Sequence, residues 1–294
     1  MNKIIDLKGK KITDETQPVF IGEVGINHNG SVDIAKRIID MAKICGVEFL
    51  KFQKRTPELC VPEDARNRVK EETPWGEMTY FEYKKRMEFG IDEFKIIDNY
   101  CKEKQIIWFA SVWDIPSVDF MEEFDTPCYK VPSAKLTDKE LLDKLRKVGK
   151  PIILSTGMST QAEIDKAVAF LNDTKLVIMH CNSSYPAKDE ELNLNYIKVL
   201  TQKYPQHIVG YSGHEEGITA SLIAALLGAK LIERHITIDR AMWGTDQSAS
   251  IEFSGLRRLV RDLKLIDTWL GDGVKKLYES EIIAKKKLRD KETL

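Results

Sequence analysis

The 294-residue sequence predicts an α/β fold of one domain, a closed (β/α)8 TIM barrel. Short apolar runs alternate with longer amphipathic segments, which is the pattern of repeated parallel βα units. Eight such runs occur, and a barrel of this type needs roughly 250 residues. The candidate strands are 19–24, 48–53, 106–111, 128–133, 151–156, 175–181, 207–212 and 230–235.

Helical patterns follow most of these strands. Residues 31–44 carry apolar side chains at helical spacing, and Ser31 is a candidate N-cap. Residues 137–148 open with Thr137 and have a glutamate three positions later, which is the spacing of a capping box. Both segments therefore fit the helices of βα units.

Two segments do not fit the alternation. Residues 1–17 contain a Lys-Gly-Lys turn between two short stretches, which predicts a small hairpin before the first barrel strand. Residues 54–91, after the second strand, form a segment too long for an ordinary βα loop and rich in aromatic and charged residues, so we expect them to cover an active site. With no linker or change of composition, 1–294 is predicted to be one domain with a helical tail over 255–294.

The composition excludes several classes of function. The chain has 45 lysines and arginines against 46 aspartates and glutamates, so its charge does not favour binding to nucleic acid or to an anionic membrane. The five cysteines form no CxxC pair, and neither a signal peptide nor a membrane span of about 18 apolar residues is apparent. No nucleotide cofactor is expected, because GxGxxG and P-loop patterns are missing. We expect a cytoplasmic protein with small-molecule partners, and a homo-oligomer is compatible with the sequence.

Polar side chains end nearly every candidate strand, where such barrels keep their active sites. They are Glu23; Lys51 and Gln53; Ser111; Lys130 and Ser133; Ser155 and Thr156; His180, Cys181 and Asn182; Ser212 and His214; and His235. A buried lysine is costly unless it is paired, so this clustering favours an enzyme. Lys51 and Lys130 near several serines predict a site for a small, multiply negative ligand. The alternative is a structural ion network with Glu23 or Glu233.

His214 and His235 end the last two candidate strands. Adjacent parallel strands lie about 4.8 Å apart, so the two imidazoles could share one metal ion. The spacing equally fits histidines that only make structural hydrogen bonds. Two nitrogen ligands completed by water oxygens would suit Mn²⁺, Fe²⁺ or Zn²⁺ better than Ca²⁺.

Ordered sequence motifs point to a known family. They are Ile21 to Gly30 (IGEVGINHNG), Leu50 to Gln53 (LKFQ), Thr73 to Gly76 (TPWG), Tyr80 to Phe89, Lys130 to Ser133 (KVPS), Leu154 to Met158 (LSTGM), His180-Cys181 with Tyr185-Pro186, Gly210 to His214 (GYSGH), Glu233 to His235 (ERH) and Gly244 to Gln247 (GTDQ). In these motifs the sequence resembles the sialic acid synthases, which join phosphoenolpyruvate to an N-acetylated hexose to make nonulosonic acids. The resemblance covers most of the chain.

The resemblance implies the same barrel and a set of site residues. Phosphoenolpyruvate would be held by Lys51, Ser111, Lys130, Ser133, Ser155, Ser183 and Ser212, and the sugar by Gln53, Tyr185, Asp246 and the residue at position 135. His214 and His235 would hold one divalent metal, Mn²⁺ or Mg²⁺, while Glu23 would transfer protons and His235 would also act in catalysis. In the implied reaction, C3 of phosphoenolpyruvate attacks the open-chain aldehyde, water adds at C2, and phosphate leaves by C–O cleavage.

Three features depart from the family pattern. Family members commonly continue into a small antifreeze-like domain that lends an arginine to a neighbouring subunit's sugar pocket, whereas this sequence has a charged tail after Leu277. Lys135 stands where the family often has an acidic sugar contact, so we expect either a phosphorylated or acceptor-rich sugar or a lysine extended into solvent. Ser183 stands where some members have asparagine.

Two other functions remain open at this point. A Schiff-base aldolase would use Lys51 or Lys130 on pyruvate, would need no metal and would be trapped by borohydride. A catalytically silent barrel would bind a sugar or a partner protein. It would have no chemical need for Glu23, both lysines and both histidines together.

Overall fold

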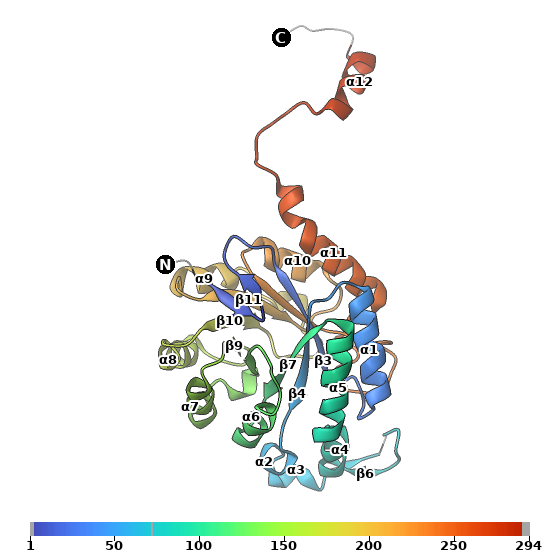
Figure 1. Cartoon of the computed structure of the whole chain (residues 1–294), viewed down its shortest axis with the longest axis vertical. Coiled ribbons are helices and arrows are strands. Elements are labelled where there is room, and N and C mark those ends of the chain that lie inside the picture. The colour runs from blue at the N-terminus through green and yellow to red at the C-terminus, as the bar shows by residue number, and fades with distance from the viewer. Residues whose placement is uncertain (1–2, 72, 290–294) are drawn as a thin grey trace.

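Eight parallel strands close into a barrel in the computed structural model, which describes residues 3–71 and 73–289 (Figure 1). The strands are β3 (Val19–Gly25), β4 (Phe49–Lys54), β7 (Ile107–Val112), β8 (Tyr129–Val131), β9 (Ile152–Ser155), β10 (Leu176–Cys181), β11 (Ile208–Gly213) and β12 (Leu231–His235). The helices around them are α1 (Val32–Ile44), α5 (Ile91–Lys104), α6 (Ile115–Met121), α7 (Lys139–Val148), α8 (Gln161–Phe170), α9 (Tyr196–Lys203), α10 (Thr219–Leu226) and α11 (Phe253–Leu270). The predicted (β/α)8 fold is confirmed.

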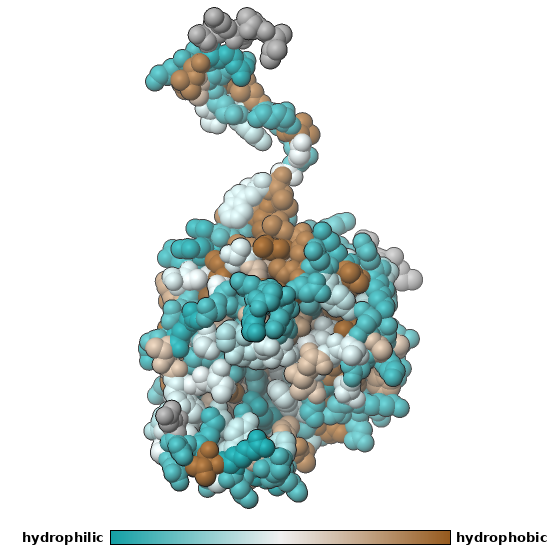
Figure 2. Space-filling view, turned by 180° about the vertical axis from the view of Figure 1, so that it is seen from behind, coloured by the Kyte–Doolittle hydropathy of each residue, from teal (hydrophilic) through white to brown (hydrophobic). Residues whose placement is uncertain are grey.

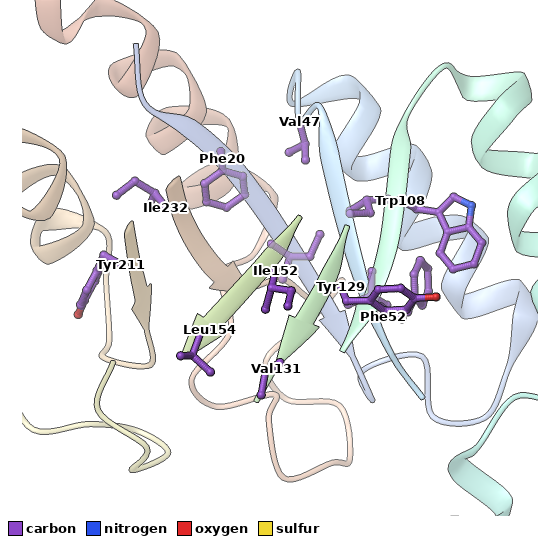
Figure 3. Packing of buried hydrophobic residues seen from close by; sticks show 14 of the residues in the cluster. Phe20, Val47, Phe52, Trp108, Tyr129, Val131, Ile152, Leu154, Tyr211 and Ile232 are labelled. Carbon is purple, nitrogen blue, oxygen red and sulfur yellow. The ribbon is translucent and has the colours of Figure 1, made fainter. Parts of the chain in front are cut away.

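Alternation along the strands decides which side chains face the barrel interior. On β4, Phe52 points outward toward the helices (Figure 3), where its ring centre lies 6.3 Å from that of Phe94 on α5. Its neighbours Lys51 and Gln53 therefore point inward and line a central cavity. On β8 the same alternation turns Lys130 inward. The apolar contacts between barrel and helices thus fix the orientation of the polar residues.

Helix caps explain where two of the helices begin. Ser31 caps α1 as predicted, because its Oγ accepts a hydrogen bond from the backbone N of Ile34 at 3.3 Å. For α7 the predicted cap, Thr137, is wrong. Asp138 takes this place and accepts from the backbone N of Leu141 at 3.1 Å. A carboxylate satisfies the free amide and also favours the positive end of the helix dipole.

The predicted N-terminal hairpin is confirmed as β1 (Ile5–Leu7) paired antiparallel with β2 (Lys10–Ile12); residues 1–2 of the predicted segment 1–17 lie outside the described part. Its apolar side chains join the inward-facing residues at the amino ends of the barrel strands, including Phe49 and Phe109. The hairpin therefore closes the bottom of the barrel. Substrates have to enter at the opposite end, where the strands terminate.

Ile12 of β2 allows a test of how firmly the hairpin packs against the barrel, because its side chain is fully buried. We expect Ile12→Ala to lower the free energy of unfolding by about 2–5 kcal/mol, since the cavity left behind lies in a packed layer. Urea unfolding measures this loss. Ile4→Ala, at a residue 49% exposed, is the matched control and should change stability by less than about 0.5 kcal/mol. Equal stability of the two variants would show that the hairpin is only loosely attached.

The segment 54–91 is a compact insertion rather than a plain loop. Its elements are α2 (Pro57–Cys60), α3 (Glu63–Arg66), β5 (Val69–Lys70), β6 (Met78–Thr79) and α4 (Tyr80–Met87). Strands β5 and β6 pair antiparallel, and Thr79 and Glu82 form a capping box at the start of α4. Tyr83 and Met87 of α4 pack on Ile26, which directly follows β3. The insertion therefore lies at the carboxyl end of the barrel.

The predicted tail over 255–294 needs a correction. Helix α11 begins at Phe253 and buries an apolar face that includes Leu256, Leu259 and Leu263, so it is the eighth helix of the barrel. Beyond it, α12 (Glu279–Leu288) has no buried residue and lies away from the barrel, as Figures 1 and 2 show. Residues 290–294 lie outside the described part. Among the described residues, no helix combines the length and apolar character that crossing a membrane requires.

Candidate active site

A cavity of about 140 Å³ opens where the barrel strands end. Twelve of the predicted site residues line it: Glu23, Lys51, Gln53, Ser111, Lys130, Ser133, Ser155, Ser183, Tyr185, Ser212, His214 and His235. Strand register explains why they meet, because β3 pairs Glu23 with His235 of β12 on one side and with Lys51 of β4 on the other. Their individual roles remain predictions.

Two lysines and two glutamates form a buried ion cluster at the base of this cavity. The ammonium of Lys51 lies 3.2 Å from a carboxylate oxygen of Glu23 and 3.2 Å from one of Glu233. Lys130 lies 3.3 Å from the same Glu233 oxygen, to which Ser212 also donates a hydrogen bond at 2.9 Å. All four charged side chains are at most 5% exposed. The ion network expected from Lys51, Lys130 and Glu233 thus exists, and it coexists with a cavity for a ligand.

Burial and ion pairing shift the pKa values of the four side chains in this cluster in different directions. Burial raises the pKa of Glu23, although Lys51 opposes the shift. Burial alone would also raise the pKa of Glu233, but Lys130 and Lys51 lower it well below its ordinary value. Burial lowers the pKa of Lys130, whereas Glu23 and Glu233 overcome burial at Lys51 and raise its pKa. Glu233 is therefore the fixed anion, and Glu23 is the carboxyl that can take up or release a proton near neutrality.

Several hydroxyl groups surround the lysines. Ser111 accepts a hydrogen bond from the ammonium of Lys51 at 2.9 Å, and Ser133 accepts one from the backbone N of Gly157 at 3.1 Å. The hydroxyl of Ser155 is buried and has no hydrogen-bond partner among the described residues. Gly157 leaves room for these groups, because a Cβ there would come within 2.2 Å of the Ser183 hydroxyl. Hydroxyls with spare bonding capacity beside two ammonium groups suit an anion.

Gln53 connects Glu23 to a charged side chain behind it. Its amide nitrogen donates to Glu23 at 2.9 Å, while its amide oxygen accepts from Arg55 at 2.7 Å. Arg55 is in turn paired with Glu88 at 2.7 Å and lies 5.0 Å from the ring centre of Trp113. These contacts fix the orientation of the Gln53 amide.

The two predicted metal ligands face the cavity side by side, with ring centres 5.4 Å apart. The Nδ1 of His214 donates to the carbonyl oxygen of Asn182 at 2.6 Å, which leaves Nε2 of the neutral ring with a free lone pair. Nδ1 of His235 is buried without a hydrogen bond and lies 3.7 Å from Asp246. Within 3–71 and 73–289 no group of three or more His, Cys, Asp or Glu side chains could hold an ion. A divalent ion bound by these two histidines would need water or substrate oxygens as its remaining ligands.

Two residues expected to touch the sugar do not line the cavity. Asp246 lies at its edge, beside His235. Lys135 ends the 3-10 turn Ser133–Lys135, and its ammonium pairs with Asp138 at 3.0 Å. The carboxylate that caps α7 attracts this lysine, and the expected contact between Lys135 and the sugar stays a prediction.

Four residues that line the cavity had no role expected from the sequence, namely Trp113, Pro132, Ala134 and Met158. For Trp113 a signal existed, since it lies two positions after Ser111 and β-strand alternation brings such positions to one face. Met158 adopts a left-handed backbone with φ of 48° and is 69% exposed, which no simple sequence pattern predicts.

Comparisons with known proteins agree with this fold. The model of the NeuB family matches residues 38–275. Human N-acetylneuraminate-9-phosphate synthase is 38% identical over 276 residues, covering 92% of this chain and 76% of that protein. N,N'-diacetyllegionaminic acid synthase of Campylobacter jejuni is 34% identical over 269 residues, covering 90% and 80%.

A solved structure extends the likeness over the whole chain. The crystal structure of N-acetylneuraminic acid synthetase from Leptospira borgpetersenii matches with a TM-score of 0.83 and 31% identity, covering 99% of both chains. The family match and the identity to several synthases agree with the motifs at the strand ends. The chain belongs to the NeuB family and is a carbon–carbon bond-forming transferase of the N-acetylneuraminate synthase type.

Proposed function

We infer that this protein condenses phosphoenolpyruvate with the open-chain aldehyde of an N-acetylated hexose, giving a nonulosonic acid and phosphate. The observation that carries this proposal is the buried cavity in which Lys51 and Lys130 meet hydroxyl groups, one of them the unpartnered Ser155. Phosphoenolpyruvate carries a phosphate and a carboxylate, and two ammonium groups can compensate both. Relatives named as synthases of sialic, legionaminic and pseudaminic acids support the class of product.

Binding of phosphoenolpyruvate would rearrange the charges of the cluster. In the free protein, one carboxylate oxygen of Glu233 forms ion pairs with the ammonium groups of Lys51 and Lys130. An incoming anion would share these ammonium groups, and Ser111, Ser155 and Ser212 would supply short hydrogen bonds. Because the lysines are already held in place by the glutamates, little reorganisation is needed when the substrate binds.

The histidine end of the cavity would hold the aldehyde. A divalent ion held by His214 and His235 would polarise the carbonyl oxygen and stabilise the charge that develops there. Asp246 and Gln53 flank this end and would orient the sugar. C3 of phosphoenolpyruvate then forms a bond to the aldehyde carbon, which leaves positive character at C2.

Water completes the reaction at C2. Its oxygen bonds to C2, one of its protons goes to the oxygen of the former aldehyde and the other to phosphate, and the bond between C2 and the bridging oxygen breaks, so C2 becomes a ketone and phosphate leaves with that oxygen. Glu23 suits the proton transfer, because its burial raises the pKa of the carboxyl toward neutrality. Its hydrogen bond from Gln53 orients it toward the cavity.

The test of this function combines a substrate screen with a label. Phosphoenolpyruvate, Mn²⁺ and a panel of N-acetylated hexoses are incubated with the protein, and phosphate release and product mass are measured. With oxygen-18 in the bridging position, we expect the label to leave with phosphate and borohydride to attach no substrate to Lys51 or Lys130. Label retained in the sugar acid would exclude C–O cleavage, and a borohydride adduct would favour the Schiff-base aldolase. Sugar binding without turnover would favour a silent barrel.

A further inference from the structure

A buried ion pair lies on the outer side of the two strands that lead to His214 and His235. Nη1 of Arg234, on β12, is 2.7 Å from a carboxylate oxygen of Glu215, and both side chains are 1% exposed. Alternation along β12 explains this placement, because Glu233 and His235 line the cavity and Arg234 between them therefore points away from it. The pair thus belongs to the layer between the barrel and its helices.

This ion pair connects the sequence neighbours of both candidate metal ligands. Glu215 directly follows His214, and Arg234 directly precedes His235. Strands β11 and β12 are adjacent in the barrel, and their register pairs Gly213 with Arg234. The ion pair therefore holds together the two chain segments that carry the imidazoles, whose ring centres lie 5.4 Å apart.

Arg234 also fixes the loop after β11 through hydrogen bonds to its backbone. The guanidinium donates to the carbonyl oxygens of Glu215 and Gly217, the latter at 2.8 Å, and to the hydroxyl of Ser221 at 3.0 Å. Tyr211 donates to the second carboxylate oxygen of Glu215 at 2.7 Å. A planar guanidinium offers several donors in fixed directions, which an ammonium group does not. The loop and β12 are thus joined by a set of bonds with a defined geometry.

Gly213 leaves the space that this network fills. A Cβ there would come within 2.5 Å of a carboxylate oxygen of Glu215 and within 2.6 Å of the Tyr211 ring. Taking two charges out of water is costly, and an apolar pair of similar volume is often as stable or more so. The network therefore suits a role in fixing geometry better than a role in stability alone.

The two histidines differ in how they are held by other groups. The carbonyl oxygen of His214 accepts from the backbone N of Ala187 at 3.0 Å, and its Nδ1 donates to the carbonyl oxygen of Asn182. Nδ1 of His235 forms no hydrogen bond with any described residue. The position of His235 therefore depends strongly on the backbone of β12, which Arg234 ties to the loop that begins at His214.

We propose that the ion pair of Arg234 and Glu215 positions His214 and His235 for a divalent ion. This inference rests on the proposed function, because the ion has its role there. Neither member of the pair lines the cavity, so both act through the backbone that carries the histidines. Groups that orient metal ligands in this way typically account for about 10- to 100-fold in metal affinity.

Binding of Mn²⁺ tests the proposal without any turnover. Titration calorimetry gives the dissociation constants of the wild type, Glu215→Gln and Arg234→Lys, and circular dichroism checks that each is folded. We expect both variants to bind Mn²⁺ about tenfold more weakly or worse. Glutamine keeps the volume but loses the ion pair, and lysine keeps the charge but loses the fork of donors. If neither variant folds, Tyr211→Phe decides, because it removes only the hydroxyl that holds Glu215 and should still weaken binding.

Glu216→Gln is the matched control, since Glu216 is the next residue and pairs with Arg240 at the surface. Ile12→Ala controls for lost stability, because this residue is buried at the closed end of the barrel. Both should keep the Mn²⁺ affinity of the wild type. Unchanged affinity in folded Glu215→Gln and Arg234→Lys, or in Tyr211→Phe where it decides, would overturn the positioning role, as would an equal loss in Ile12→Ala.

The same titrations separate this inference from the proposed function. A wild type that binds Mn²⁺ but condenses no substrates would refute the proposed function, and the comparison of affinities would still decide the positioning role. A wild type that binds no Mn²⁺ would refute both the metal step and the positioning role.

Discussion

Replacing His214 and His235 together by alanine should lower kcat/KM by at least about 10³-fold, because the charge that develops on the aldehyde oxygen then loses its compensation. Among the described residues, these two imidazoles are the ones that line the cavity at this end, with ring centres 5.4 Å apart. An ion that depends on two protein ligands cannot be retained once both are removed. Titration calorimetry with Mn²⁺ gives a readout that does not depend on turnover, and the double variant should show no binding.

A histidine elsewhere in the barrel provides the control. His207 directly precedes β11 and lies at the closed end of the barrel, whereas His214 follows the other end of the same strand. His207→Gln should therefore bind Mn²⁺ with the affinity of the wild type. The metal role would be refuted by a double variant that keeps Mn²⁺ affinity, or by full turnover of the wild type in excess chelator.

The barrel could be predicted because its signal is local. Apolar runs and amphipathic segments follow each other along the chain, and the period-two pattern of a strand assigns each residue to one face. Phe52 packs outward on α5, so Lys51 and Gln53 point inward whatever the rest of the chain does. The carboxyl ends of parallel strands meet at one edge, so polar residues at those ends were bound to converge.

Other features depend on pairs that the sequence does not place together. Glu233 pairs with both lysines, at 3.2 Å from Lys51 and 3.3 Å from Lys130, because β12, β4 and β8 project side chains into one interior. The ammonium groups of Lys70 on β5 and Lys84 on α4 both lie over the ring of Tyr83. That of Lys70 also lies over Trp243, in the loop after β12. No periodic pattern links these segments, and only the folded insertion brings them into contact.

Competition among neighbouring charges explains why the partner of Lys135 could not be predicted from the sequence. The sequence indicates a cation next to a predicted pocket, but it does not say which nearby carboxylate will pair with it. Asp138 lies three residues later and is already fixed as the cap of α7, so pairing with it costs little conformational entropy. The same helix cap was assigned to Thr137 because a threonine and a glutamate in capping-box spacing give the same signal as an aspartate one position later.

Glu233→Gln should reveal how the buried cluster is balanced in the absence of substrate. The glutamine keeps the volume and can still accept from Ser212, but Lys51 and Lys130 lose their shared carboxylate. Breaking a buried ion pair by removing one partner is expected to lower the free energy of unfolding by about 3 kcal/mol or more. Denaturant unfolding measures the loss, and Glu58→Gln, which breaks an exposed pair, should cost about 1 kcal/mol or less.

Two further stability measurements on Glu233→Gln, one with added inorganic phosphate and one with a second substitution, show whether its loss of stability comes from unbalanced charge or from packing. If unbalanced positive charge is the cause, phosphate should stabilise Glu233→Gln more than the wild type, because the anion takes the place of the missing carboxylate and binds only the folded state. Adding Lys130→Met should recover part of the lost stability, since one uncompensated ammonium group is then removed. A further loss in the double variant, or equal stabilisation of both proteins by phosphate, would mean that Glu233 acts through packing. The lysines would then not be poised for an anion before substrate arrives.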